Sequence, residues 1–258
     1  MSNILVINDF VSKGKMAGNM MDPVFTYKGH QSFFLPTSLI SNDFSCGKVA
    51  VLDTSDYMRD CFKVWDELDF NFDIIFVGFI NNNSQKDLII EYIKSRENNP
   101  MIILDPIMGD NGSLYKSVGK EKIDIYKEII PYADILIPNL TEANFLDLDD
   151  YQHLKNDNKK YLITSVYDSS GYYSLGIDKD LHKSYFKKLD LNYAGTGDLM
   201  DALFLIYYLE NNDFNKAIDL AVDKMSEILN IQKKTLPNSN EIMIESYLSL
   251  LDKEGNIA

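Results

Sequence analysis

The sequence predicts an α/β protein of three layers, in which helices cover both faces of a mostly parallel central sheet. Short β-rich runs alternate with segments of helical periodicity, a pattern typical of parallel strands joined by helices. Several of these runs are apolar at every position, as expected for central strands that helices bury on both sides. Ligands of such open sheets gather beyond the carboxyl ends of the strands, so the residues that follow each strand are the candidates for function.

Each element is predicted from its own pattern of apolar residues. Strands are expected at residues 4–7, 33–36, 74–77, 101–104, 135–137 and 161–164. Amphipathic spacing predicts helices at 56–68, 84–97 and 118–130. The polar segment 147–160 is expected to hold a reduced helix or a loop. An antiparallel pair is predicted at 172–177 and 182–186, and two or three helices close the chain at 198–210, 215–231 and 241–251.

Length and composition favour one large domain over residues 1–258, because no repeat and no Pro/Gly/Ser-rich linker divides the chain. No run approaches the roughly 18 apolar residues of a spanning helix, and the first residues carry no basic stretch of a signal peptide. Cys46 and Cys61 have no metal-ligand spacing and fit a reducing compartment, so a cytoplasmic protein without membrane contact is expected. The formal net charge of −14 disfavours nucleic-acid binding, since it repels phosphate backbones.

The strongest motif is Gly195-Thr196-Gly197-Asp198, which directly precedes an apolar helical segment. Two glycines allow a tight turn whose amides point at one spot, and the helix start adds free N–H groups and the positive end of its dipole. This arrangement suits phosphate oxygens and places a carboxylate beside them. The alternative is a glycine loop followed by an ordinary Asp cap.

Two further motifs follow predicted strands. Asp105 and Asp110 lie in the segment Asp-Pro-Ile-Met-Gly-Asp after strand 101–104, where they could hold Mg²⁺ directly or through water. Turn chemistry alone also explains the Asp and Gly residues there. Asn139 and Glu142 follow strand 135–137, where they could reach the same metal, or form an ordinary helix N-terminus with an acidic first turn. An anion cradle, a neighbouring carboxylate and metal-binding oxygens are the parts that phosphoryl transfer needs.

In the order of its motifs the chain resembles the pyridoxal kinase branch of the ribokinase superfamily over roughly residues 3–235. The glycine motif is similar to the anion hole and catalytic Asp of the superfamily, and Asn139 to Glu142 to its Asn-x-x-Glu metal motif. The segment from Asp105 to Asp110 and the N-terminal pattern around residues 7–10, 35–37 and 41–42 resemble the vitamin B6 kinases.

The resemblance implies a ribokinase-like fold and an ATP-dependent kinase that phosphorylates the 5′-hydroxymethyl group of a B6 vitamer. Asp198 would be the general base, with Gly195, Thr196 and Gly197 as the anion hole. The other implied site residues fall into three groups: Asp105 and Glu142 at Mg²⁺; Asp110, Tyr115, Asn139, Thr164 and Ser165 at the nucleotide; Asp9, Ser41 and Phe79 at the pyridine ring. A monovalent cation and a homodimer are also implied.

The chain departs from the family pattern in the acceptor pocket and at the cation site. Asp9 stands where many relatives have Ser, Phe44 where Thr is common, and Phe79 where some have Tyr. Ile137 replaces a common Thr beside the cation site. The lysines at positions 13 and 15 are interpreted as a solvated pair and not as phosphate hooks.

Other functions remain open at this point. A sister kinase for hydroxymethylpyrimidine or a sugar would share Asp198 and the metal motif. A nucleotide-binding regulator without catalysis would be expected to lack the base or the anion hole, and neither is missing. A dinucleotide-dependent dehydrogenase is disfavoured, because no Gly-x-Gly-x-x-Gly follows the first strand.

Overall fold

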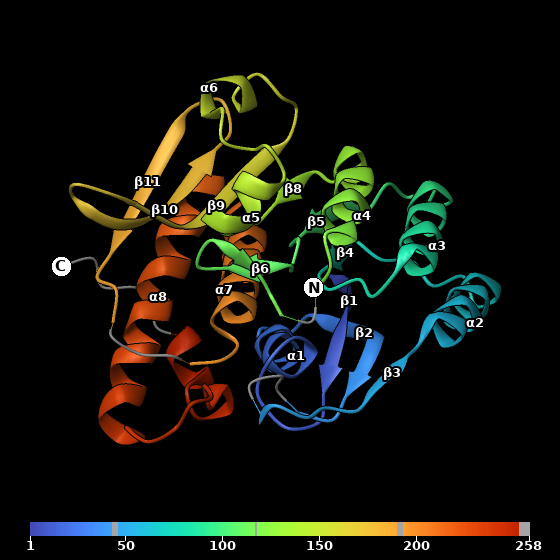
Figure 1. Cartoon of the computed structure of the whole chain (residues 1–258), viewed down its shortest axis with the longest axis horizontal. Helices are drawn as coiled ribbons and strands as arrows, with labels where there is room; N and C mark the ends of the chain where they lie inside the picture. Colours follow the sequence, from blue (N-terminus) through green and yellow to red (C-terminus); the bar gives the residue numbers. More distant parts are fainter. Residues whose placement is uncertain (43–45, 117, 190–192, 253–258) are drawn as a thin grey trace.

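The computed structural model describes residues 1–42, 46–116, 118–189 and 193–252. Over these residues nine strands form one sheet with the order β11-β10-β9-β8-β5-β4-β1-β2-β3 (Figure 1). In chain order they are β1 (Asn3–Val11), β2 (Gln31–Ile40), β3 (Val51–Asp53), β4 (Ile74–Val77), β5 (Met101–Leu104), β8 (Ile135–Leu136), β9 (Lys160–Asp168), β10 (Gly171–Ile177) and β11 (Leu181–Phe186). The run from β9 to β2 is parallel throughout, and antiparallel strands occur only at its two edges in the part described.

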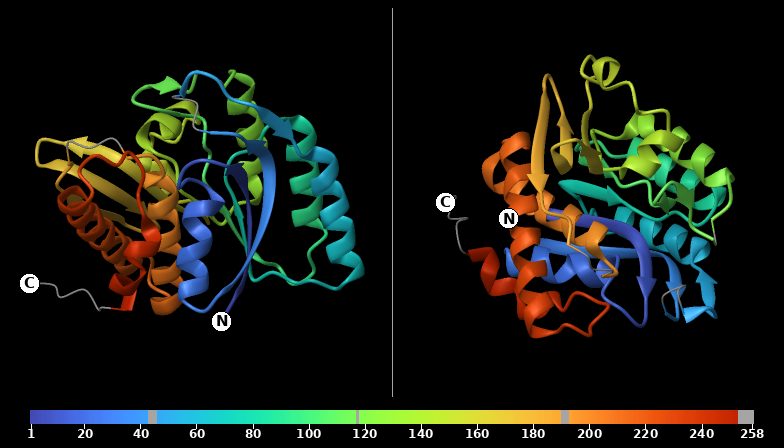
Figure 2. Two further views of the ribbon diagram at one scale, coloured as in Figure 1. Left: turned by 90° about the horizontal axis from the view of Figure 1, so that it is seen from below. Right: turned by 60° about the vertical axis from the view of Figure 1, so that its left-hand side comes forward.

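Helices cover both faces of this sheet, as the sequence predicts (Figure 2). They are α1 (Gly18–Tyr27), α2 (Ser55–Glu67), α3 (Asn83–Lys94), α4 (Glu121–Ile129), α5 (Leu140–Phe145), α6 (Tyr151–Leu154), α7 (Thr196–Asn211) and α8 (Phe214–Thr235). A small hairpin, β6 (Gly109–Asp110) with β7 (Ser113–Leu114), forms a sheet of its own. The predicted three-layer α/β class, a mostly parallel sheet with helices on both faces, is therefore confirmed.

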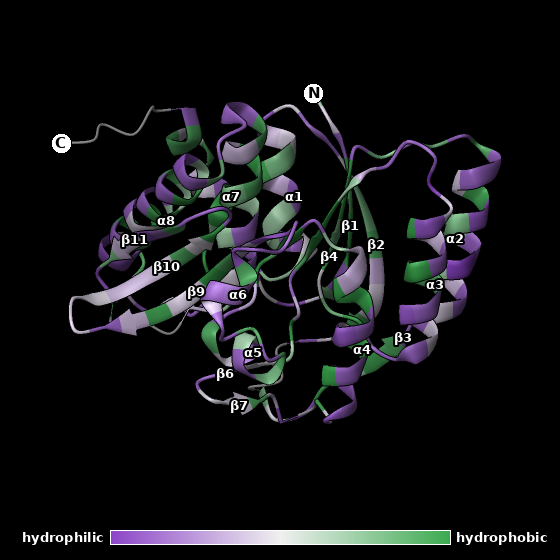
Figure 3. Cartoon of the chain, turned by 90° about the horizontal axis from the view of Figure 1, so that it is seen from above, coloured by the Kyte–Doolittle hydropathy of each residue, from purple (hydrophilic) through white to green (hydrophobic). Residues whose placement is uncertain are grey.

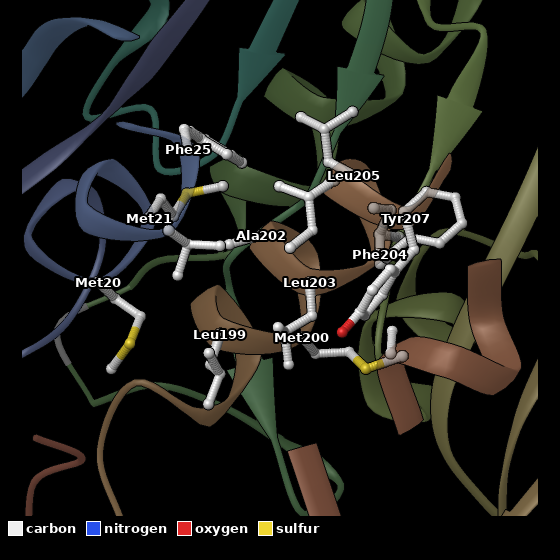
Figure 4. Packing of buried hydrophobic residues seen from close by; sticks show 14 of the residues in the cluster. Met20, Met21, Phe25, Leu199, Met200, Ala202, Leu203, Phe204, Leu205 and Tyr207 are labelled. Carbon is white, nitrogen blue, oxygen red and sulfur yellow. The ribbon is translucent and has the colours of Figure 1, made fainter. Parts of the chain in front are cut away.

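The alternation of side chains in the strands divides the core into two layers. In β1, Ile4 and Val6 face a cluster with α1, α7 and α8, whereas Leu5 and Ile7 face a second cluster with α2, α3 and α4. In Figure 3 these strands are coloured hydrophobic, while α2 and α3 carry many hydrophilic residues on their surfaces. Figure 4 shows the first layer at the contact of α7 with Met20, Met21 and Phe25 of α1. Since α7 is apolar nearly all round, it is buried between α1, α8 and the sheet.

Two terminal features differ from the expectation. The pattern at 241–251 predicts a helix, which is wrong: the chain forms two short 3₁₀ helices there, η3 (Ile244–Ser246) and η4 (Leu248–Asp252). The side chain of Gln232 takes the backbone groups that would continue a helix, since it donates to the carbonyl of Glu241 (2.8 Å) and accepts from the amide of Met243 (2.8 Å). Helix α1 is not predicted, because Pro23 lies inside it and interrupts its hydrogen bonding.

A third short 3₁₀ helix, η2 (Ile130–Tyr132), extends α4. Over the residues that the structure describes, none of the helices combines the length and apolarity needed to cross a bilayer.

Candidate functional site

The predicted site residues lie around the point where the direction of the chain through the sheet reverses. From β1 the chain proceeds to β2 on one side, whereas β4, β5 and β8 follow in order on the other side. Such a switch point opens a crevice at the carboxyl ends of the strands. Asn8 and Asp9 lie towards the end of β1, Phe79 follows β4, Asp105 follows β5 and Asn139 follows β8. The local order of the strands thus brings these residues to one edge of the sheet.

The glycine motif forms the start of α7. Gly195 is the N-cap residue and has a left-handed conformation (φ 81°). A Cβ atom at Gly195 would lie 2.1 Å from the carbonyl oxygen of Lys15, so both the conformation and the close approach require glycine. A Cβ atom at Gly197, in contrast, would have no heavy atom within 4 Å. The free N–H groups of this helix start are suited to bind an anion, as the motif predicts.

Asp198 lies in the first turn of α7 and is held by three hydrogen-bond donors. Its carboxylate accepts from the backbone amides of Ala17 and of Asp198 itself. The side-chain amide of Asn8 lies 3.5 Å from Asp198 Oδ1. Burial raises the pKa of Asp198, and the three donors oppose that rise. A desolvated carboxylate in a fixed orientation, beside a helix N-terminus, is suited to accept a proton.

Asn8 is a residue whose role the sequence reasoning missed. Its side chain is fully buried, and its Oδ1 accepts from the amides of Asp9 and Phe79, both at 2.9 Å. A Cβ atom at Gly78 would lie 2.6 Å from Asn8, so the chain after β4 passes directly over this side chain. The signal was available, because Asn8 is a polar residue inside an apolar strand.

Asp9 lies at a bulge in β1, where the register with β2 shifts. Burial raises the pKa of Asp9 to about 7, and the nearby charge of Asp198 adds to this rise. The Asp9 side chain therefore changes its charge near neutral pH. The carboxyl groups of Asp9 and Asp198 therefore lie near each other at the end of β1. Their surroundings differ, because Asp198 is held by three hydrogen-bond donors.

A second group of carboxyl side chains lies beneath the site. Asp105 and Asp201 are buried and hydrogen-bonded to each other, and burial raises the pKa of both well above the usual range. The charges of Glu142 and Asp198 raise both pKa values further. Asp201 Oδ2 has no hydrogen-bond partner. The sequence reasoning missed Asp201, although an acidic residue three positions after Asp198 in an apolar helix shares its face.

Asn139 and Glu142 form a capping box at the start of α5, so the helix N-terminus offered as the alternative is real. Glu142 Oε2 accepts from the amide of Asn139 (2.9 Å), and Oε1 accepts from the amides of Met108 (3.0 Å) and Gly109 (3.4 Å). The side-chain amide of Asn139 donates to the carbonyl of Gly109 (2.8 Å). Burial raises the pKa of Glu142 to about 7, against these donors. Both residues therefore fix the turn that follows Asp105.

The arrangement fits Mg²⁺ held by at most one or two carboxylates, with water and phosphate oxygens completing its coordination. Within the described ranges, no three His, Cys, Asp or Glu side chains are arranged as ligands of one metal ion. Mg²⁺ commonly keeps several waters and takes one or two carboxylates together with substrate phosphates. The unpartnered oxygen of Asp201 and the mutual repulsion of the buried carboxyl groups indicate a place where a cation would relieve charge.

The residues predicted near the nucleotide lie on the α5 side of the site. Asp110 is exposed on β6 and accepts from the backbone and side chain of Asn111. Tyr115 follows β7, and its pKa is raised by burial and by the charges of carboxylates including Glu142 and Asp198. Thr164 pairs with Asn139 in an isolated parallel bridge. Ser165 is exposed, in a left-handed conformation (φ 60°).

The acceptor residues are only partly brought together. Phe79 is half-buried and tied to Asn8, beside Asp9. Ser41 is exposed and its hydroxyl is engaged locally, with Asn42 (2.7 Å) and the amide of Ala50 (2.9 Å). Ile137 is buried.

Phe44 lies outside the described residues. Lys15 forms an ion pair with Glu245 and Lys13 is exposed, in keeping with the interpretation that neither is a phosphate hook.

Comparison with known proteins shows the family of the chain. The phosphomethylpyrimidine kinase family model matches residues 37–238. The chain is 29% identical to a pyridoxal kinase of Dictyostelium discoideum over 224 residues, which are 73% of each protein. It is 34% identical to a pyridoxal kinase of Arabidopsis thaliana over 181 residues, 60% of this chain and 57% of that protein.

The fold also matches a solved structure over its whole length. A putative phosphomethylpyrimidine kinase from Bacteroides thetaiotaomicron superimposes with a TM-score of 0.92 and 25% identity, covering 100% of this chain and 96% of the other. The matched family segment contains Phe79, Asp105, Glu142 and the whole glycine motif. The chain belongs to the phosphomethylpyrimidine kinase family, whose fold and motifs are those of the ribokinase-type kinases.

Proposed function

We propose that this protein is an ATP-dependent pyridoxal kinase that phosphorylates the 5′-hydroxymethyl group of B6 vitamers. The observation that carries the proposal is the position of Asp198, a desolvated carboxylate tied to Asn8 and Ala17 at the anion-binding start of α7. The similarity to the Dictyostelium pyridoxal kinase over 73% of both proteins supports the choice of acceptor.

In this proposal Asp198 accepts the proton of the hydroxymethyl group as the oxygen attacks the γ-phosphate of ATP. The amides of Gly195, Thr196 and Gly197 stabilise the charge that develops on the transferred group. Phe79 provides an aromatic wall for the pyridine ring. Asp9 hydrogen-bonds the ring, and Ser41 completes the edge of the pocket.

On the nucleotide side, Asp110, Tyr115, Asn139, Thr164 and Ser165 contact ATP in this proposal. Asp105 and Glu142 would hold Mg²⁺ through water, and the ion would neutralise charge on the phosphates. A monovalent cation at the buried Ile137 could use only backbone oxygens of that residue, because its side chain offers none.

A hydroxymethylpyrimidine kinase is the competing function, because the family model and the Bacteroides structure are both described by a pyrimidine substrate. A coupled assay of ADP release separates the candidates, with pyridoxal, pyridoxine, pyridoxamine, hydroxymethylpyrimidine and ribose as acceptors. We expect at least one B6 vitamer to exceed hydroxymethylpyrimidine and ribose about tenfold or more in kcat/KM. Saturable turnover of hydroxymethylpyrimidine or ribose without turnover of any vitamer would refute the pyridoxal assignment. Absence of turnover with every acceptor, despite ATP binding, would favour a regulator.

We also propose a cytoplasmic homodimer without affinity for nucleic acid. The side chains of Leu39, Val51, Leu52 and Tyr57 are large, apolar and exposed at the β3 edge of the sheet, where a second copy could cover them. Light scattering after size-exclusion chromatography tests the dimer, and Leu52→Asp is expected to shift it to a monomer.

A gel-shift assay at low salt tests binding of nucleic acid, and cell fractionation tests the compartment.

A further inference from the structure

Helix α4 holds the turn that carries the aromatic wall of the proposed acceptor pocket. This turn, residues 78–81, connects β4 to α3, and we call it the Phe79 turn. On the side of β1 it is held by Asn8, which accepts from the amide of Phe79 at 2.9 Å. The amides of Gly78 and Asn81 bind the carbonyl of Ile7 and the side chain of Gln85. On the side away from β1, two side chains of α4, Lys122 and Tyr126, bind further backbone groups of the turn.

Tyr126 is fully buried, and its hydroxyl binds two backbone groups of the turn. It lies 3.3 Å from the amide of Ile80, from which it accepts, and 3.1 Å from the carbonyl oxygen of Gly78. It also reaches the carbonyl oxygen of Ile107 at 3.2 Å, in the segment that follows Asp105. A single hydroxyl therefore ties the Phe79 turn to the neighbouring strand end.

Lys122, one turn earlier in α4, is a buried cation that is paired with backbone and an aromatic ring. Its side chain donates to the carbonyl oxygens of Ile80 and of Asn81, the latter at 2.6 Å. Its Nζ atom lies 4.5 Å from the centroid of the Phe79 ring. Within the described part of the chain no carboxylate forms an ion pair with it.

A buried ammonium without a carboxylate partner is unusual in a chain with 39 acidic residues. Lys122 is only 4% exposed, and burial lowers its pKa to about 8. The desolvation of this cation costs free energy that its contacts must offset. Those contacts are all with the Phe79 turn, which indicates that the cation serves the geometry of this turn.

We propose that Lys122 and Tyr126 are positioning residues for the acceptor, and this proposal rests on the function proposed above. Together they fix the backbone of the Phe79 turn, and Lys122 covers one face of the Phe79 ring. The half-buried ring is then held in one orientation, and an aromatic wall of this kind favours flat heterocycles over sugars as acceptors. The contacts of Lys122 are confined to the Phe79 turn, whereas the Tyr126 hydroxyl also reaches Ile107, so Lys122 gives the sharper test of an effect on the acceptor alone.

Steady-state kinetics of the full chain test this proposal. Lys122→Met keeps the length of the side chain and removes its charge and donors, and Tyr126→Phe removes only the hydroxyl. We expect Lys122→Met to raise KM for the acceptor about fivefold or more, with KM for ATP within about twofold of wild type. Tyr126→Phe is expected to change the same constant in the same direction. Lys122→Arg retains the charge and is expected to restore most of the affinity for the acceptor.

Lys127→Met is the matched control, because Lys127 lies in the same helix and forms an exposed ion pair with Asp147. It is expected to leave both KM values at wild type. A thermal melt monitors folding, and if Lys122→Met does not fold, Tyr126→Phe and Lys122→Arg still decide the outcome. Equal increases in both KM values, or an unchanged KM for the acceptor, would overturn the proposal.

A double-mutant cycle with Phe79→Ala tests whether Lys122 acts through the ring. We expect the acceptor KM of Phe79→Ala/Lys122→Met to equal that of Phe79→Ala alone, whereas additive effects would contradict the proposed route. The cycle also separates this inference from the proposed function. If hydroxymethylpyrimidine is the acceptor, the pyridoxal assignment fails while the same dependence on Lys122 is expected. Turnover of ribose alone would overturn both.

Discussion

The side-chain amide of Asn8 in β1 lies 3.5 Å from the carboxylate of Asp198 in α7, across 190 positions of sequence. The same Asn8 side chain accepts from the amides of Asp9 and Phe79. One buried residue at the switch point therefore connects the proposed base to two residues of the proposed acceptor pocket. This connection explains how the position of an acceptor and the orientation of the base can be set together.

Asn8→Asp is expected to move the pH dependence of catalysis. The substitution keeps the size and the acceptor oxygen of Asn8, but replaces the donor to Asp198 with a second negative charge. Two carboxylates at this distance raise the pKa of Asp198 further, so the acidic limb of kcat/KM should shift to higher pH by about one unit or more. A pH–rate profile measures this shift. Asn230→Asp, on the exposed surface of α8, is the control, and an unshifted profile in Asn8→Asp would separate Asn8 from the base.

Asp198→Asn is expected to lower kcat by about 10²–10⁴-fold with little change in ATP binding. The amide keeps an oxygen for the donors from Ala17 and Asn8, but it cannot accept the proton of the hydroxymethyl group. Steady-state kinetics together with nucleotide titration by calorimetry measure the two effects. Near wild-type turnover would leave Asp198 as a helix cap.

Gly195→Ala is expected to disturb both the anion loop and the base. The new Cβ atom would lie 2.1 Å from the carbonyl oxygen of Lys15, so the loop that donates to Asp198 through Ala17 must move. We expect kcat to fall about tenfold or more, and the free energy of unfolding to fall by about 1 kcal/mol or more. Gly29→Ala is the control, because Gly29 has a similar φ of 80° with open space around it. Equal losses in both variants would assign the effect to backbone strain alone.

Glu142→Gln is expected to affect stability as well as the requirement for Mg²⁺. An amide cannot accept at both ends, so one of the hydrogen bonds to Asn139 or to the turn at Met108 is lost. The free energy of unfolding should fall by about 1–3 kcal/mol, and the Mg²⁺ concentration at half-maximal activity should rise. Urea unfolding and a Mg²⁺ titration measure the two effects, with exposed Glu97→Gln as the control. A loss of stability without any change in Mg²⁺ dependence would leave Glu142 a purely structural residue.

The sequence predicts the sheet well because its central strands are distinct apolar runs. The bounds of β4 and β5 agree with the expectation at both ends, and the antiparallel pair β10–β11 is also confirmed. The short edge strand β3 was not predicted, because a run of three exposed residues is too short to give a strand pattern. The 3₁₀ helices near the C-terminus depend on a tertiary contact with Gln232, which periodicity does not contain.

Candidate site residues could be predicted where they form a contiguous sequence motif, as in the glycine motif before Asp198. It was not predictable where the contact is long-range. Asn8, Asp201 and Lys122 interact with residues far away in sequence. Asn8 and Asp201 are polar residues in apolar runs, whereas Lys122 stands among other charged residues at the start of α4. Glu142 shows a further limit, because the same spacing is expected of a capping box and of a metal motif, and the structure shows the capping box.

Asp9 is expected to make the stability of the protein depend on pH near neutrality. Its pKa is about 7 in the folded protein and 3.8 for an unperturbed carboxyl group. Between these values the folded state holds a proton that the unfolded state has lost, so the free energy of unfolding falls as pH rises from about 4 to about 7. At 1.36 kcal/mol per pKa unit, this loss amounts to at most about 4 kcal/mol above pH 7.

Asp9→Asn removes this dependence, because an amide does not titrate. The variant should become progressively more stable than wild type between pH 5 and pH 8, whereas exposed Asp22→Asn should follow the wild-type curve. Urea unfolding at pH 5, 6, 7 and 8 measures the difference. A constant offset between Asp9→Asn and wild type over this range would mean that Asp9 is charged throughout.

The protonated form also bears on function, since a neutral Asp9 donates a hydrogen bond to an unprotonated pyridine nitrogen while the ionised form accepts one from a pyridinium. We therefore expect Asp9→Ala to raise KM for the vitamer more than KM for ATP. Measured below and above pH 7, this rise in KM should be larger at the pH at which the wild-type protein has the lower KM for the vitamer.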